Sequence, residues 1–212
     1  MCSSDLIHII YIRTVSKLIA FEGIDGSGKS TQAALLFEAF KAKEIKTILT
    51  AEPTKRPIGR MIRDIFSGKL IADQQVIAAL FAADRLDHLT NEEDGMIRLL
   101  AEGTTIISDR YFLSSYAYHS VFVPMDWVIE INRRAVALCP AQLHLFIDVD
   151  PEVSMERIRA RQTALEIYET MDNLKRVREN YLEAIERTKD SATVRIIDGN
   201  RNAETVHQEI DR

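Results

Sequence analysis

The chain has 212 residues, of which 46% are hydrophobic and 28% charged, and this composition is typical of one globular domain with a sizeable core. Its net charge of −5 argues against a nucleic-acid partner, because binding to a phosphate backbone usually needs a basic face. No apolar run approaches the roughly 20 residues that span a membrane, so we expect no membrane partner.

Residues 1–16 precede the first predicted element and form an N-terminal extension. Asp5 comes before any positive charge and His8 interrupts the apolar run, unlike in a signal peptide. A cytoplasmic extension ahead of the domain and a misplaced translation start both stay open. Cys2 and Cys139 match no metal or redox spacing, so we expect free thiols in a reducing cytosol.

The rest of the chain alternates strand and helix patterns. Residues 17–23 ("KLIAFEG") are a short β-rich apolar run, and apolar residues from Ala33 to Phe40 then recur on one helix face. Strands alternating with helices predict an α/β fold, with a doubly wound five-stranded parallel sheet and helices on both faces. Ligands bind beyond the carboxyl ends of such strands. The further strands are expected at 46–53, 104–110, 143–150 and "TVRIIDG". Helices are expected at 57–66, 73–88, 91–102, 114–121 and 125–138, and two more are expected, one before the last strand and one at the C-terminus.

A phosphate-binding motif follows the first strand. Gly23, Gly28, Lys29 and Ser30 satisfy G-x-x-x-x-G-K-[ST], between a predicted strand and a predicted helix. Backbone N–H groups and the helix N-terminus would surround phosphate oxygens. Lys29 would bridge the β- and γ-phosphates, and the Ser30 hydroxyl would hold Mg²⁺. The motif predicts a triphosphate site, and the lack of a guanine-reading Asn-Lys-x-Asp favours a small kinase over a GTPase.

Two further segments suggest an acceptor site. Phe81 and Arg85 lie four residues apart on one helix face, an arrangement that suits a flat base and a phosphate. Asp109 and Arg110 end a strand, where Asp109 could hold Mg²⁺ through water and Arg110 could grip a phosphate. The structural alternatives are a core phenylalanine with a surface ion pair, and a charged pair that merely caps a strand end.

Four segments together resemble thymidylate kinase: "FEGIDGSGKST", "EPTKRPIG", "FAADR" and "DRYFLSSYAY", in that family's order and spacing. "LFIDVDPEVSMERIRAR" continues the match, which covers about Lys17 to Ile210. The resemblance implies a P-loop NTP hydrolase fold, a single kinase domain at 17–212 with a small lid at about 160–168. It also implies a homodimer that transfers the γ-phosphate of ATP to dTMP with Mg²⁺, for dTTP biosynthesis.

The resemblance also implies roles for residues that match the family's motifs. The ATP-binding residues would be Gly23, Ile24, Asp25, Gly26, Ser27, Gly28, Lys29, Ser30 and Thr31. The dTMP-binding residues would be Asp25, Glu52, Pro53, Phe81, Arg85, Arg110, Ser115 and Tyr118. The catalytic residues would be Lys29, Arg110, Asp25, Arg161 and Arg157, and the metal ligands Ser30 and Asp109.

Within this set, Asp25 would hydrogen-bond the deoxyribose 3′-hydroxyl or orient nearby arginines. Phe81 would stack on thymine, while Arg85 and Arg110 would hold its base and phosphate. The other acceptor residues would be Ser115 and Tyr118, around base and sugar, and Glu52 and Pro53, on the floor of the site.

The chain departs from the family pattern in its positive charges. Its phosphate loop has no arginine and the common bacterial lid pattern is missing, so the remaining candidates for the transition-state arginine are Arg157, Arg159 and Arg161. Arg157 and Arg161 share a helix face from which Arg159 points away, and Arg161 is the first candidate and Arg157 the second because Arg161 is nearest the predicted lid. A solvated basic helix face is the alternative.

Two further departures concern the acceptor. Ala51 stands where many bacterial members have arginine, and His119 where glutamine is frequent, which leaves the acceptor range open. A kinase for dUMP, another monophosphate or a deoxynucleoside is therefore one alternative function. A catalytically weak nucleotide-binding regulator is the other.

Overall fold

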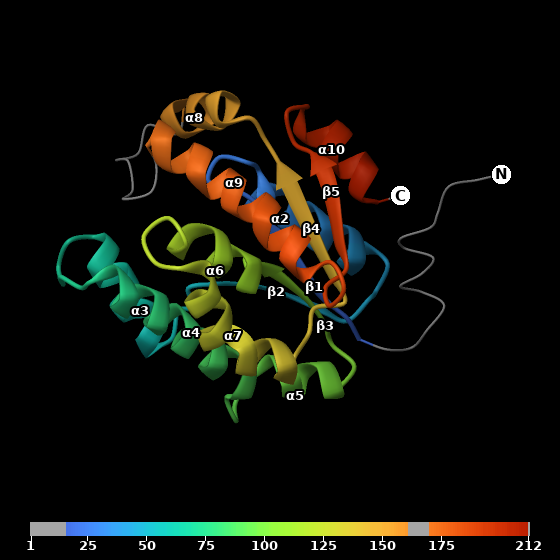
Figure 1. Cartoon of the computed structure of the whole chain (residues 1–212). Helices are drawn as coiled ribbons and strands as arrows, with labels where there is room; N and C mark the ends of the chain where they lie inside the picture. Colours follow the sequence, from blue (N-terminus) through green and yellow to red (C-terminus); the bar gives the residue numbers. More distant parts are fainter. Residues whose placement is uncertain (1–15, 161–169, 212) are drawn as a thin grey trace.

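The computed structural model describes residues 16–160 and 170–211. Within them, five strands form one parallel sheet in the order β2-β3-β1-β4-β5 (Figure 1). This confirms the predicted five-stranded parallel sheet, whereas residues 161–168 of the predicted lid lie outside the described residues. The strands are β1 (Leu18–Glu22), β2 (Thr47–Ala51), β3 (Thr105–Asp109), β4 (Leu143–Asp148) and β5 (Val194–Asp198).

Helices cover both faces of the sheet, so the fold is doubly wound. On one face α2 (Lys29–Ala42) and α10 (Ala203–Ile210) bury Leu36, Phe40 and Val206 against the strands. The larger core on the other face packs α6 (Phe112–His119), α7 (Met125–Leu138) and α9 (Met171–Thr188). None of the described helices combines the length and the apolar character needed to cross a membrane. The other helices are α3 (Pro57–Phe66), α4 (Gln74–Thr90), α5 (Met96–Ala101) and α8 (Pro151–Ala160).

The central strands are apolar on both faces, as expected for a parallel sheet covered by helices. In β1 the side chains of Leu18 and Ala20 enter one core and those of Ile19 and Phe21 enter the other. The edge strands β2 and β5 are only partly buried. Figure 1 shows α3, α4, α5 and α7 gathered beyond the β2 side of the sheet, with α10 beside β5 and α8 beside α9.

One predicted helix is wrong at its start. The pattern predicted a helix over 91–102, but α4 ends at Thr90 and α5 begins at Met96. The Asn91 side chain accepts a hydrogen bond from the backbone N–H of Glu93 at 2.8 Å, which forms a local turn. Gly95 approaches the Asn91 carbonyl too closely for a side chain, so the turn closes there.

The register places three strand ends side by side. Asp109, the last residue of β3, pairs with Phe21 of β1 and with Ala51 of β2. The residues that follow these strands are the phosphate loop, Glu52 and Arg110. Segments far apart in the sequence therefore meet at one edge of the sheet, where parallel sheets bind ligands.

Candidate active site

The phosphate loop, residues 23–28, joins β1 to α2 through a tight backbone path. Gly23 and Gly26 have φ values of 149° and 75°. A Cβ at Gly23 would lie 2.7 Å from the carbonyl oxygen of Ile147, and one at Gly26 would lie 2.6 Å from that of Ser154. The loop therefore excludes side chains at both positions and leaves its backbone N–H groups beside the N-terminus of α2, a site that favours anions.

A cavity of about 520 Å³ lies over this loop, and we call it the phosphate-loop cavity. The loop and the first turn of α2 form one wall, with Lys29, Ser30 and Thr31. The residues at the ends of β2 and β3 and Arg157 of α8 complete the lining. The predicted nucleotide-binding residues Ile24 and Ser27 have buried side chains, so only their backbone is available to a ligand.

A second cavity, of about 560 Å³, lies between α3, α4 and α6, and we call it the aromatic cavity. Phe81, Arg85, Ser115 and Tyr118, all predicted for the acceptor, line it together. Its other lining residues include Pro53, Arg63, Phe66, Ser67, Ser114 and His119. Helix α4 brings Phe81 and Arg85 to it one turn apart, as their spacing predicted.

The two cavities share a wall made by Asp25, Ala51, Glu52 and Arg110. The Arg110 guanidinium pairs with the Asp25 carboxylate and lies 4.6 Å from the centre of the Tyr118 ring. The Tyr118 hydroxyl donates to the other Asp25 oxygen at 3.0 Å. Anionic ends of two ligands, one in each cavity, would therefore meet beside the Arg110 guanidinium of this wall.

The charges around Asp25 explain why an anion-binding loop contains a carboxylate. Burial alone would raise the pKa of Asp25, but the charges of Arg110 and Lys29 and the Tyr118 hydrogen bond outweigh it, so the pKa lies below its ordinary value. Lys29 Nζ lies 3.5 Å from the same carboxylate. Burial, and next the charge of Arg110, lower the pKa of Lys29. Asp25 thus stays ionised and holds the cations of Arg110 and Lys29 close together.

The backbone of Arg110 is itself unusual. Its φ of 74° lies in the left-handed region, which residues other than glycine rarely adopt. The surroundings hold this conformation, because its N–H donates to the Phe21 carbonyl at 2.9 Å and the Ser108 hydroxyl donates to its carbonyl at 2.7 Å. Strained backbone of this kind concentrates at functional sites. Here it turns the side chain from the strand end onto the shared wall.

Two oxygen groups in the phosphate-loop cavity fit a magnesium ion. Ser30 is exposed at the start of α2, and Asp109 ends β3. Among the described residues, Asp109 Oδ1 is buried without a hydrogen-bond partner, so this oxygen is available to a ligand. A hydroxyl and a carboxylate are hard oxygen ligands of the kind that Mg²⁺ takes beside phosphates. The predicted metal ligands therefore lie in one cavity with suitable chemistry.

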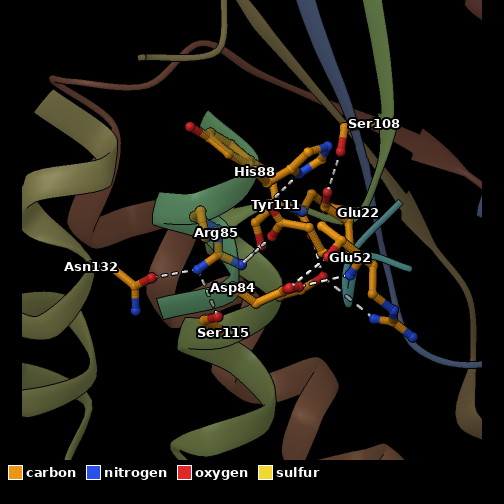
Figure 2. Close-up of polar contacts among 12 residues, drawn as sticks. Glu22, Glu52, Asp84, Arg85, His88, Ser108, Tyr111, Ser115 and Asn132 are labelled. Atoms are coloured by element: carbon orange, nitrogen blue, oxygen red, sulfur yellow. Dashed lines mark hydrogen bonds and ion pairs between the residues drawn. The ribbon is translucent and has the colours of Figure 1, made fainter. Parts of the chain in front are cut away.

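Arg85 is held in a buried polar network rather than in a surface ion pair (Figure 2). Its guanidinium pairs with Glu52 at 2.5 Å and donates to the Ser115 hydroxyl at 3.0 Å and to Asn132. His88 Nδ1 lies 3.1 Å from the other Glu52 oxygen. Among the described residues, Arg85 Nε is buried and has no partner. The network neutralises the charge and leaves one donor for a ligand.

Sequence reasoning missed several residues of this site. Arg63 and Phe66 line the aromatic cavity from α3, and Arg63 donates to the Pro53 carbonyl at 3.0 Å. Glu22, fully buried at the end of β1, accepts a hydrogen bond from the backbone N–H of Tyr111 at 3.1 Å. Two features of the sequence could have indicated these residues. Arg63 and Phe66 are spaced three apart on the helix after the Glu-Pro loop, and Glu22 is an acidic residue at the end of an apolar strand.

The arginines near the predicted lid differ in their placement. Arg157 lines the phosphate-loop cavity and donates to the carbonyls of Gly199 at 2.9 Å and Arg201 at 3.3 Å. Arg159 is exposed, as its position on the helix predicted. Arg161, the first candidate from the sequence, lies outside the described residues. Within the described part, α8 therefore directs one arginine toward the loop.

Comparisons with known proteins agree on one family. The family model described as thymidylate kinase matches residues 21–210. A probable thymidylate kinase of Thermococcus kodakarensis is 38% identical over 203 residues, which cover 91% of this chain and 94% of the relative. One from Methanocaldococcus jannaschii is 38% identical over 193 residues, covering 91% and 92%. One from Methanococcus aeolicus is 37% identical over 200 residues, covering 92% and 94%.

Proposed function

Because the chain belongs to the thymidylate kinase family, we propose that it binds ATP in the phosphate-loop cavity and dTMP in the aromatic cavity. The γ-phosphate of ATP is transferred to dTMP, giving dTDP and ADP. The observation that carries this arrangement is the shared wall, where Asp25 and Arg110 face both cavities. Two phosphorylated substrates bound on either side would bring their phosphates to the same guanidinium, that of Arg110.

The aromatic cavity offers each part of dTMP a matching group. Phe81 provides an aromatic face for thymine, and Arg85 Nε provides a donor for a base carbonyl. Tyr118 and Asp25, which line the cavity and are hydrogen-bonded to each other, would face the deoxyribose. Arg110 then holds the acceptor phosphate with a charge-assisted contact. In this proposal Glu52 acts indirectly, because it fixes the Arg85 guanidinium.

Transfer requires positioning and charge neutralisation more than acid–base chemistry. A dTMP phosphate oxygen attacks the γ-phosphorus as the bond from the γ-phosphorus to the bridging oxygen of ADP breaks. Lys29 and the loop N–H groups stabilise the charge on the β- and γ-phosphates, while Arg110 holds the attacking phosphate. Ser30 and Asp109 would hold Mg²⁺, which supplies further neutralisation of the phosphate charge when bound.

The remaining expectations of the family form part of the proposal. Arg157, which lines the phosphate-loop cavity, would contact ATP from α8, and Arg161 stays a prediction for the transition state. We also propose a homodimer in the cytoplasm. The homodimer and the cytoplasmic location are proposed from the family to which the chain belongs.

A coupled assay of ADP release tests the acceptor. With ATP and Mg²⁺, dTMP should give the highest kcat/KM among a panel of deoxynucleoside and nucleoside monophosphates and free nucleosides, because the cavity combines an aromatic face, base donors and a phosphate-binding arginine. A clear preference for another acceptor would overturn the assignment. Tight binding of ATP and dTMP without turnover at high enzyme concentration would instead indicate a regulator.

The Asp25→Ala variant tests whether Asp25 serves the binding of dTMP or that of ATP. It should lower kcat and raise the KM for dTMP, because Arg110 loses the carboxylate that orients it. The affinity for ATP should change little, since the loop backbone is unaltered and Lys29 keeps its hydrogen bond to the Ile24 carbonyl at 3.3 Å. Steady-state kinetics with each substrate varied, together with calorimetric ATP binding, measure both effects. An equal loss of ATP affinity would show that Asp25 shapes the loop itself.

A further inference from the structure

Glu22 is a fully buried carboxyl group that takes no part in the proposed reaction. It is the last residue of β1, and its side chain lines neither the phosphate-loop cavity nor the aromatic cavity. His144 Nδ1 lies 3.7 Å from Oε1, which is too far for a hydrogen bond. Burying a carboxyl group costs free energy unless its oxygens accept hydrogen bonds. The groups that donate to Glu22 therefore indicate what it holds in place.

Both carboxyl oxygens accept hydrogen bonds from the segment around Arg110. Oε1 accepts from the backbone N–H of Tyr111 at 3.1 Å (Figure 2), and Oε2 accepts from the Ser114 hydroxyl at 2.5 Å. The Tyr181 hydroxyl of α9 is a third donor, 3.3 Å from Oε2. Tyr111 directly follows Arg110, and Ser114 is in the first turn of α6. Glu22 thus joins the end of β1 to the segment that carries Arg110.

The Ser114 hydroxyl connects Glu22 to the Arg110 guanidinium. Its oxygen accepts from Arg110 Nη1 at 3.3 Å and lies 2.7 Å from the Tyr181 hydroxyl. A hydroxyl has one proton and two lone pairs, so the proton donated to Glu22 leaves both lone pairs for Arg110 and Tyr181. The carboxyl oxygen therefore sets the direction of this hydroxyl and keeps one of its lone pairs toward the guanidinium.

Arg110 is consequently held at two places on its guanidinium and at one on its backbone. Nη2 pairs with Asp25, and Nη1 faces Ser114. The peptide N–H that follows Arg110 is the one bound to Glu22, next to the backbone with the φ of 74°. A planar guanidinium with two separate contacts cannot turn about either of them. Glu22 supports one of these contacts and the adjacent peptide, whereas Asp25 supplies the other contact.

We propose that Glu22 is a positioning residue: through the Ser114 hydroxyl and the Tyr111 N–H, it orients the Arg110 guanidinium toward the acceptor phosphate. The inference rests on the proposed contact between Arg110 and that phosphate. It differs from a purely structural role in one respect, because the effect of Glu22 on the acceptor should vanish when the guanidinium is absent.

Glu22→Gln tests the proposal, since it keeps the size of the side chain but turns one acceptor oxygen into a donor group. We expect the affinity for dTMP to fall about tenfold, and kcat/KM for dTMP to fall by at least as much. The affinity for ATP should stay within about twofold, because the loop backbone that surrounds the phosphates is unaltered. Ser114→Ala should reproduce the selective loss. Glu102→Gln, an exposed carboxyl-to-amide change at the end of α5, is the matched control and should behave as the wild type.

A double-mutant cycle, measured by calorimetry of dTMP binding, separates positioning from folding. In an Arg110→Met background, Glu22→Gln should change the dTMP affinity by less than about twofold, because no guanidinium is left to orient. A fall that is equally large with and without Arg110 would overturn the proposal and leave Glu22 a structural residue, and so would an unchanged dTMP affinity in Glu22→Gln. Should Glu22→Gln fail to fold, Glu22→Asp, which shortens the side chain by one methylene group, takes its place in the cycle. Absence of dTMP binding to the wild type would instead reject the proposed function.

Discussion

Lys29→Met is expected to lower kcat by about 10³-fold or more, because it removes the buried cation that the proposed function puts beside the transferred phosphate. Lys29 is 6% exposed in the phosphate-loop cavity, and its ammonium lies 3.5 Å from Asp25. Methionine has a similar length and no charge, so packing beneath the loop is largely kept. Single-turnover measurement of γ-phosphate transfer at saturating ATP and dTMP gives the effect on the chemical step.

The control for this prediction lies on the same helix. Lys41→Met changes an exposed lysine near the end of α2, whose ion pair with Glu38 is long, at 3.9 Å. It should retain wild-type kcat and thermal stability, since exposed pairs contribute little. A fall of less than tenfold for Lys29→Met, with ATP still bound, would show that Arg110 and the loop N–H groups suffice to neutralise the γ-phosphate.

Glu52→Gln is expected to lower the free energy of unfolding by about 3 kcal/mol, because it leaves the Arg85 charge buried without its counter-ion. Arg85 and Glu52 are 1% and 4% exposed, and the other Arg85 contacts are neutral groups such as Ser115. Urea unfolding measures the change. The matched control is Glu102→Gln, which breaks the exposed Arg98–Glu102 pair and should cost less than about 1 kcal/mol.

The same pair gives a pH dependence with a definite sign. Burial alone would raise the pKa of Glu52, but Arg85 and His88 outweigh it and hold the pKa below its ordinary value of 4.5. A carboxyl with a depressed pKa contributes stability above the unfolded-state value and loses it as the pH falls toward the folded value. The stability difference between wild type and Glu52→Gln should therefore be constant near pH 7 and shrink below about pH 4.5. A constant difference down to pH 3 would contradict the ion-pair explanation.

Lys29 and Glu52 differ in how much of their role could be predicted from the sequence. Lys29 could be assigned to a phosphate from its motif, because six neighbouring residues define that loop locally. Glu52 could be placed at an acceptor site only by resemblance. Its partner Arg85 is 33 residues away, and the pair forms only after the end of β2 and helix α4 have packed together. The predicted surface ion pair for Arg85 was the alternative that tertiary packing excluded.

The arginines around the two cavities show the same difference between what the local sequence predicts and what packing decides. Helical spacing alone predicted that Arg159 points away from Arg157, and the structure agrees. That Arg157 reaches the carbonyls after β5 depends on the position of α8 relative to the sheet. Arg63 went unrecognised because nothing local distinguishes it from other arginines of an amphipathic helix. Its place in the aromatic cavity follows from the packing of α3 on α4.

By itself, the sequence determined the parallel α/β sheet, the phosphate loop and the kinase family, since each depends on short-range periodicity or on contiguous motifs. Only the tertiary structure decided that Asp25 and Arg110 stand between two cavities and that the Ser114 hydroxyl joins Arg110 to the buried Glu22. The physical reason is that burial, charge pairing and unpaired donors depend on side chains from separate segments. These segments meet only when the strand ends align and the helices close over them.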